Sequence, residues 1–229
     1  MQTISFVNLS LTLIPLIFVW YFYKKWTGEQ TDILYSTVRM VLQLLLIGYA
    51  LLYLFEEKNS LIGFAIILFM VVASSLITLR NTQEKTLKEY GTILLAIMIS
   101  GLFHLILIIE FVLELTPFYE PRFVIPIAGM IFANCMNVIS INIERFSKEY
   151  AQTNDFYLAR KISFKAAMIP QINSLLAVGL VSLPGMMTGQ ILSGIDPLIA
   201  VRYQMMIMTM ILSSAGVSII TYFLLKERL

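Results

Sequence analysis

Ser182-Leu-Pro-Gly-Met-Met-Thr-Gly-Gln-Ile-Leu-Ser-Gly194 interrupts an apolar run that is otherwise typical of a membrane helix. Pro184 has no backbone N–H, so it leaves a carbonyl one turn earlier without its helical partner. Gly185 and Gly189 lower helix stability further. Because lipid offers no hydrogen bonds, such freed groups are tolerated only against protein or a water-lined cavity. The stretch therefore predicts a membrane helix that is broken at Pro184-Gly185.

The residue types leave two interpretations of this break open. In the first, the broken helix forms part of a ligand pathway, since discontinuous membrane helices build substrate sites. In the second, Pro184 merely kinks the helix. Gly185 and Gly189, four residues apart, would then allow a neighbouring helix to pack closely.

The overall composition is that of a membrane protein. The 229 residues are 59% hydrophobic and 13% charged, whereas a soluble chain carries about 25% charged residues. The net charge of +2 is too small to indicate a nucleic-acid partner. One cysteine, Cys135, excludes an intramolecular disulfide. The N-terminus shows no basic segment and no cleavage site, so we interpret it as a retained first span.

Apolar segments long enough to cross a bilayer recur along the chain. A hydrocarbon core of about 30 Å needs about 20 residues of helix. The pattern predicts an all-α integral membrane protein, a single transmembrane domain over residues 1–229 with about seven helices. The predicted spans are residues 4–23 (with a kink at Pro15), 33–55, 61–79, 91–115, 123–141, 170–193 and 198–225.

Loop charge predicts the orientation of these spans. Lys and Arg gather in the loops that follow the first, third, fifth and seventh spans, whereas the alternate loops hold only Lys58 and Arg122. Because basic loops stay on the cytoplasmic side, we expect the N-terminus outside and the C-terminus in the cytoplasm.

Polar residues within the spans are candidates for substrate contact. Arg39 and Gln43 lie four residues apart on one face of the second span. Arg202 lies near the outer end of the seventh. For both arginines, snorkelling or pairing is the alternative role. Asn134 and Asn137 could form a weak coordinating patch, or they could bond neighbouring helices.

Metal-binding and catalytic signals are sparse. His104 and Glu110 are six residues apart and face different sides of one helix, so no dense His/Cys metal site is expected. The thioethers of Met186 and Met187 suit a soft metal, although methionine also fills apolar gaps. The sequence contains no phosphate-binding P-loop, nucleophile elbow or H-E-x-x-H motif. We therefore expect a chain that is not an enzyme and binds no cofactor itself.

Residues 142–168 form the only sizeable polar segment. Phe146, Tyr150, Tyr157 and Phe164 recur near helical spacing, with Lys and Arg between them. This pattern predicts a cytoplasmic amphipathic helix. Such a helix either lies on anionic lipid or docks onto a soluble partner.

Ordered blocks of sequence in four of the predicted spans carry a family resemblance. The blocks are Arg39-Met-Val-Leu-Gln43 with Gly48-Tyr49, Val124-Ile-Pro-Ile-Ala-Gly-Met130, Ala166-Ala-Met-Ile-Pro170, Gly179-Leu-Val-Ser-Leu-Pro-Gly-Met-Met-Thr-Gly189, Gly194-Ile-Asp-Pro197 and Arg202-Tyr-Gln-Met-Met206. Together they resemble the Fet-type iron-export permease family. Its members are bacterial membrane subunits of ABC transporters, together with plant aluminium-sensitivity and aluminium-tolerance half-transporters.

The resemblance implies a permease homodimer in a bacterial cell membrane, joined to cytoplasmic ATPase subunits that bind ATP. It implies export of a metal ion, with iron first and a nucleotide sugar as the alternative cargo. The family's Pro-Gly-Met-Met element falls on the break, which favours the pathway interpretation. The candidate pathway residues are Pro184, Gly185, Met186, Met187, Thr188, Gly189 and Gln190, with Asn134 and Asn137 opposite and Arg39, Gln43 and Arg202 as further candidates.

Coupling to an ATPase would fall on residues 142–168. Relatives carry an acidic residue there, followed by a Leu-x-Leu-Gly-Ala-type turn, whereas this chain has Glu144-Arg-Phe-Ser-Lys-Glu-Tyr-Ala151 and lacks the glycine. The candidate coupling residues are Glu144, Phe146, Tyr150, Tyr157, Lys161 and Lys165. Two other functions stay open at this stage: an ATP-independent carrier or channel, and a non-transporting membrane partner that recruits a soluble protein.

Overall fold

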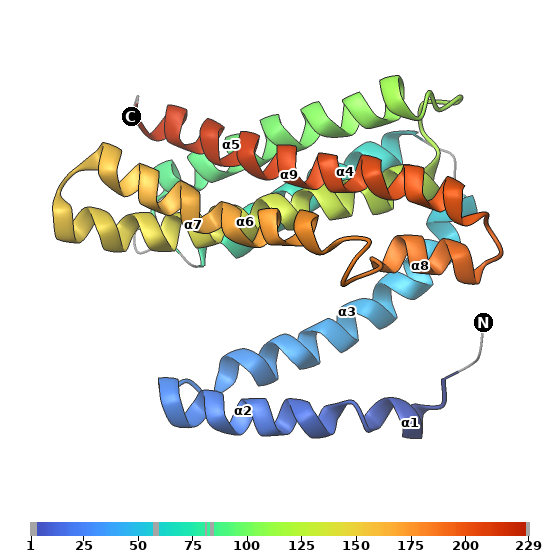
Figure 1. Ribbon diagram of the computed structural model, residues 1–229, viewed down its shortest axis with the longest axis horizontal. Helices are drawn as coiled ribbons and strands as arrows, with labels where there is room; N and C mark the ends of the chain where they lie inside the picture. Colours follow the sequence, from blue (N-terminus) through green and yellow to red (C-terminus); the bar gives the residue numbers. More distant parts are fainter. Residues whose placement is uncertain (1–3, 57–59, 81, 83–84, 228–229) are drawn as a thin grey trace. The chain divides into compact units, whose positions relative to one another are not determined.

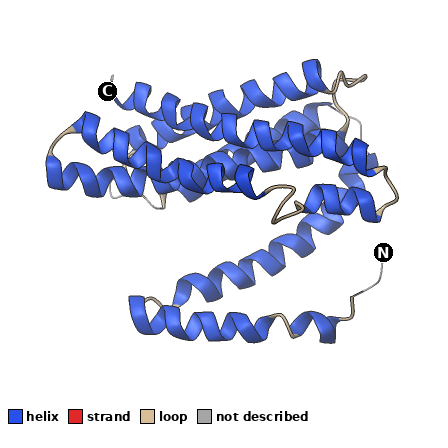
Figure 2. Cartoon of the chain, in the orientation of Figure 1, coloured by secondary structure: helices blue, strands red, loops and turns tan. Residues whose placement is uncertain are grey.

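The protein is built from α-helices, as the sequence predicts (Figure 2). The structure is a computed structural model that describes residues 4–56, 60–80, 82 and 85–227. Within these residues, six helical segments are long and apolar enough to cross a membrane. They are Phe6–Thr27, Thr31–Leu54, Ser60–Leu79, Leu87–Val112, Pro121–Thr153 and Pro197–Glu227. The all-α membrane class is confirmed, while the predicted sixth span takes a different form, described below.

The chain divides into two compact units, and the first is a helical hairpin. Its helices are α1 (Phe6–Ser10), α2 (Leu13–Thr27) and α3 (Thr31–Glu56). The kink predicted at Pro15 takes the form of an interruption at residues 11–12, about one turn before the proline. Pro15 then falls in the first turn of α2, where a backbone N–H has no helical partner to lose. Gly28 ends α2 with a φ of 78°, and its N–H donates to the Lys24 carbonyl.

The second unit is a bundle organised around its longest helix, α6 (Figure 1). Its elements are α4 (Ser60–Leu79), α5 (Leu87–Ile106) with the π-helix η1 (Leu107–Val112), α6 (Pro121–Thr153), α7 (Phe156–Ala177), α8 (Gly185–Leu192) and α9 (Pro197–Glu227). Helix α6 packs against α4, α5, α7 and α9. Its buried face includes Ile131, Phe132, Val138 and Ile139, which belong to the main apolar core.

The predicted sixth span, residues 170–193, is not one continuous helix. Helix α7 already begins at Phe156, contains Pro170 in its interior, and ends at Ala177. Helix α8 begins at Gly185 with Pro184 as its N-cap. A break is therefore present, but the prediction that the helix continues up to Pro184 was wrong. Residues 178–184 are non-helical because a local turn, described below, replaces the last helical hydrogen bonds.

The single amphipathic helix predicted for residues 142–168 is instead a helical hairpin made from the end of α6 and the start of α7. The 33 residues of α6 extend about 50 Å, well beyond a hydrocarbon core of about 30 Å. The chain reverses at Asn154, which adopts a left-handed φ of 51°, a conformation that asparagine tolerates. Asp155 then caps α7 by accepting a hydrogen bond from the Leu158 N–H at 3.0 Å.

Basic side chains gather at one end of the second unit, where α4 and α9 end, α5 begins and α6 turns into α7 (Figure 1). We call this the basic end. Its basic residues are Arg80, Lys85, Lys88, Arg145, Lys148, Arg160, Lys161, Lys165 and Lys226. The described basic residues towards the opposite end are Arg122 and Arg202. This distribution agrees with a cytoplasmic basic end, and the orientation itself stays a prediction.

Close packing of α5 on α6 depends on Gly101. A Cβ added at Gly101 would lie 2.2 Å from Cε1 of the buried Phe132 ring. We expect Gly101→Ala to destabilise the protein by about 1–3 kcal/mol, the usual effect of overpacking. The unfolding midpoint in detergent should fall accordingly.

Gly129→Ala is the matched control, because no atom lies within 4 Å of a Cβ added at Gly129. Alanine also has the higher helix propensity, so this variant should keep or raise the midpoint. Equal midpoints for the two variants would contradict the contact between α5 and α6.

Candidate functional site

The break between α7 and α8 is a turn with several internal backbone hydrogen bonds. The Ala177 carbonyl accepts hydrogen bonds from the N–H groups of residues 180–182 at 2.8–3.2 Å. The Gly179 N–H donates to the Ser182 carbonyl at 2.9 Å. Gly179 has a φ of 80°, which favours glycine over any residue with a side chain. The turn thus satisfies the N–H groups of residues 178–182 within the protein, which reduces the cost of irregular backbone in a membrane.

Helix α8 follows the turn and packs against α9. Its first turn is reinforced by Thr188, whose hydroxyl lies 3.2 Å from the carbonyls of both Leu183 and Pro184. No atom lies within 4 Å of a Cβ added at Gly185 or Gly189. Within the described chain, no helix therefore packs closely against these two glycines.

A cavity of about 300 Å³ lies between α7, α8 and α9, and we call it the methionine pocket. Its lining residues are Leu175, Val178, Gly179, Met187, Val201, Gln204, Met205, Met208 and Thr209. Met187 is the predicted pathway residue that the structure places here, whereas Met186 packs against the apolar core. Gln204 was not among the predicted pathway residues. Its only signal was its place in the block that begins at Arg202.

Several other predicted pathway residues lie elsewhere. Asn134 donates from Nδ2 to a main-chain carbonyl of α9 at 2.7 Å, so it joins two helices. Asn137 is exposed on α6, and Arg202 is exposed near the start of α9. Arg39 and Gln43 are exposed on α3 in the first unit. The structure thus brings Met187 to the methionine pocket and leaves the asparagines on other surfaces.

The conventional metal ligands do not assemble into a site. His104 is buried with its Nδ1 2.7 Å from the Ser100 carbonyl, and Glu110 is exposed on η1. Among the residues that the structure describes, no group of three or more His, Cys, Asp or Glu side chains could hold a metal ion. Thioether and amide groups are the metal-binding groups that remain at the break.

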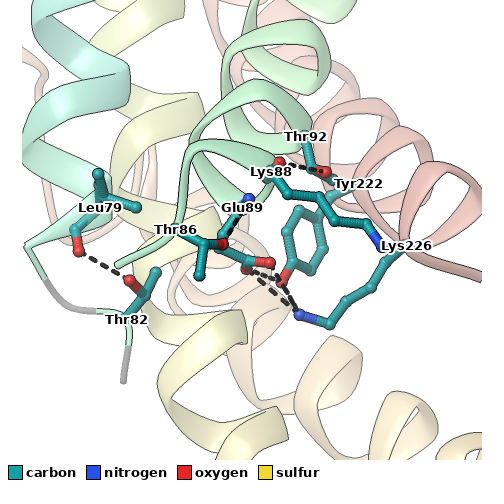
Figure 3. A network of polar contacts seen from close by, with 8 residues as sticks. All are labelled: Leu79, Thr82, Thr86, Lys88, Glu89, Thr92, Tyr222 and Lys226. Atoms are coloured by element: carbon teal, nitrogen blue, oxygen red, sulfur yellow. Dashed lines mark hydrogen bonds and ion pairs between the residues drawn. The ribbon is translucent and has the colours of Figure 1, made fainter. Parts of the chain in front are cut away.

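A buried ion pair joins α5 to α9 at the basic end (Figure 3). The Glu89 carboxylate accepts hydrogen bonds from the Tyr222 hydroxyl at 2.5 Å and from Lys226 Nζ at 3.1 and 3.3 Å. The hydroxyl of Thr86 caps the same helix end by accepting from the Glu89 N–H at 3.1 Å. The sequence analysis missed this group, because no local pattern links residues so far apart in the chain.

Aromatic rings from three helices pack beside that ion pair. Phe146 stacks on Tyr150 with ring centroids 5.6 Å apart, and it meets Phe156 and Phe223 edge to face at 5.4 and 5.3 Å. A cavity of about 390 Å³ adjoins these rings, and we call it the basic-end cavity. It is lined by Thr82, Glu89, Ile143, Phe146, Ser147, Tyr150, Ala151, Phe156 and Lys226.

The predicted coupling residues fall into two groups at this end. Phe146 is buried, and Tyr150 stacks against it at the edge of the cluster. The remaining four are exposed on the α6–α7 hairpin: Glu144, Tyr157, Lys161 and Lys165. Lys161 and Lys165 are four residues apart on α7, so they share one face of the helix. The hairpin therefore exposes a basic outer surface, and the aromatic cluster lies beneath that surface.

We expect the Glu89–Lys226 ion pair to stabilise the fold. Lys226→Met leaves the buried Glu89 carboxylate without its counter-ion. We expect a loss of about 2–3 kcal/mol, below the range of about 3–5 kcal/mol for a fully buried pair, because the Lys226 side chain remains 29% exposed. The unfolding midpoint in detergent measures this loss. The double variant Glu89→Gln/Lys226→Met should recover much of it.

Lys148→Met supplies the control, since Lys148 pairs with Glu144 on the helix surface and its side chain is 61% exposed. Exposed pairs contribute about 0–1 kcal/mol, so little change is expected. A double variant as unstable as the sum of its two single variants would contradict the buried pair.

The sequence matches the family described as "Uncharacterised protein family (UPF0014)" over residues 6–160 and 156–229. It is 33% identical to "Probable iron export permease protein FetB" of Escherichia coli (strain K12), over 86% of this chain and 81% of that protein. It is 32% identical to "Protein ALUMINUM SENSITIVE 3" of Arabidopsis thaliana, over 87% of this chain and 77% of that protein.

A third relative covers nearly the whole chain. The "UPF0014 membrane protein YjkA" of Bacillus subtilis (strain 168) is 30% identical over 95% of this chain and 94% of that protein. No solved structure matches the fold. These matches confirm the resemblance seen in the sequence blocks, and the chain belongs to the UPF0014 family of membrane proteins.

Proposed function

We propose that this chain is the membrane-spanning subunit of an ATP-driven metal-ion exporter. A homodimer of the chain would bind separate cytoplasmic subunits that hydrolyse ATP. The observation that carries the proposal is the 33% identity, over 86% of this chain, to a relative named as a probable iron export permease. That name makes iron the first cargo to test, and the relatives from Escherichia coli and Bacillus subtilis suggest a bacterial cell membrane.

The position of the α7–α8 break supports a pathway role. Val178 and Gly179 line the methionine pocket together with Met205 and Met208 of α9. Met205 lies eight residues after Pro197, which is about 12 Å along the helix. The non-helical stretch thus begins beside the third turn of α9 rather than beside its first residue, although Leu180 and Val181 are exposed. Irregular backbone at such depth is typical of transporter substrate sites.

The α6–α7 hairpin is suited to transmit a movement from the cytoplasm to this break. Helix α7 has 22 residues, about 33 Å, and it runs without interruption from the hairpin to the turn at residue 178. The aromatic cluster holds its first turn against α6 and α9 through Phe156. A subunit that pushed on the hairpin would therefore displace the end of α7 that forms the turn.

The methionine pocket favours an ion over a nucleotide sugar as cargo. None of its lining side chains is basic, whereas a diphosphate group is normally recognised by Arg, Lys or helix N-terminal amides. A nucleotide sugar stays the alternative cargo. An ATP-independent carrier or channel and a non-transporting recruiter stay the alternative functions.

Purification in mild detergent from the native host tests the partner directly. We expect a stoichiometric second subunit that hydrolyses ATP, because the chain contains no ATP-binding motif of its own. ATP hydrolysis by the complex is the measurement. A clean homomer without this activity would contradict the proposal and favour the ATP-independent alternatives.

Lys161→Glu then tests the docking surface. Because Lys161 is exposed on the hairpin, its charge reversal should leave the fold intact and reduce co-purification of the ATPase at least fivefold. Arg122→Glu is the matched control, since Arg122 is exposed towards the opposite end of the bundle. Equal loss of partner in both variants would show that the hairpin is not the docking surface.

A further inference from the structure

The methionine pocket presents a donor set to its cavity. Gln204 and Met208 are four residues apart on α9, and Met205 and Met208 are three apart, so all three share one face of that helix. Met187 reaches the same cavity from α8. Met208 is 6% exposed at the base of the pocket, and Met205 is 64% exposed at its mouth. Three methionines and one glutamine from two helices therefore line the same cavity.

The second observation is the Gln204 amide, a buried polar group in the wall of this pocket. Gln204 is 5% exposed, and its Oε1 has no hydrogen-bond partner among the residues that the structure describes. A buried carbonyl oxygen in this position is unfavourable unless something pairs with it. The hydroxyl of Thr209 does not pair with it, because that hydroxyl donates to the carbonyls of Met205 and Met206 at 3.0 and 2.9 Å.

Open volume lies beside these methionines. Methionine is commonly an adaptable gap filler, and a packed gap would leave no cavity. Here about 300 Å³ remains open among Met187, Met205 and Met208. The pocket thus has room for an ion or a small ligand beside the sulfur atoms.

The chemistry of the donors selects the ion. The lining residues include no carboxylate, imidazole or thiolate, the groups that hold Zn²⁺, Mg²⁺ and most iron ions. Thioether sulfur instead prefers soft ions such as Cu(I). A single positive charge also loses less hydration energy than a double charge on entering an apolar site without a counter-charge.

We propose that the methionine pocket binds a soft monovalent metal ion, Cu(I) or its analogue Ag(I), through Met187, Met205, Met208 and the Gln204 amide oxygen. The inference rests on the proposed function, and it adds a soft monovalent ion beside iron as a candidate cargo. The ion would contact the pocket wall that Val178 and Gly179 form, so ion binding would act directly on the α7–α8 turn.

Silver titration of the purified full-length protein tests this site. Ag(I) nitrate, which undergoes no redox reaction here, is added in chloride-free detergent buffer to protein with ¹³C-labelled methionine methyl groups. We expect the methyl signals of Met187, Met205 and Met208 to shift together and to saturate at one equivalent. An equal concentration of Zn(II) should leave them in place.

Matched variants separate coordination from folding. Met187→Leu and Met208→Leu should each weaken silver binding at least tenfold, while Met168→Leu, on a methionine of α7 outside the pocket, should leave it unchanged. Gln204→Met keeps a donor and should bind silver at least as tightly as the original protein. If a leucine variant misfolds, Gln204→Met still tests the site, because it replaces one metal-binding side chain with another.

Three outcomes would each contradict this site. The signals of all exposed methionines could shift evenly, the three pocket methionines could show no shift, or Met168→Leu could weaken silver binding as much as the pocket variants. These outcomes are distinguishable from failure of the proposed function. ATP-driven export of another ion without silver binding would refute only the pocket assignment. Silver binding at one equivalent in a protein that recruits no ATPase would refute only the exporter.

Discussion

Backbone hydrogen bonding in a lipid environment is the constraint on which the rest of the structure depends. A bilayer core provides no partner for an N–H or a carbonyl, so each must be satisfied within the protein. Long helices meet this requirement in α3, α4, α6 and α9. At the α7–α8 break the Ala177 carbonyl meets it by accepting three N–H groups, and Gly179 supplies the left-handed conformation that the turn needs. Val178 and Gly179 of this turn form part of the wall of the methionine pocket.

The second unit combines two chemically different ends. The basic end carries the hairpin, the aromatic cluster and the Glu89–Lys226 pair, whereas the methionine pocket is apolar and lined by soft donors. Helix α7 connects them, because its first turn packs in the aromatic cluster and its last residue forms the turn. A movement of α7 would therefore act on both regions, as the proposed exporter needs.

Hydropathy alone predicted the helical class and the approximate positions of α3, α4 and α9, because their apolar runs match a bilayer. It underestimated how far α6 extends towards its C-terminus and how early α7 begins, since the polar residues at these ends are also helical. Pro184 revealed the break, but its true start depends on a left-handed Gly179 that no pattern marks. Met187 was found by residue type. Gln204 and the Glu89–Lys226 pair were missed, because only the packing of α9 against α8 and α5 gives them partners.

The most direct test of the account is metal-ion transport by the purified complex in sealed vesicles whose ATPase subunits face outwards. The account predicts that Fe(II) or Cu(I) accumulates inside only when ATP is hydrolysed, and that a non-hydrolysable ATP analogue abolishes accumulation. Equal movement of the ions with and without ATP would contradict an ATP-driven exporter and identify a carrier or channel. No movement of either ion in a complex that hydrolyses ATP would contradict the assignment of a metal cargo.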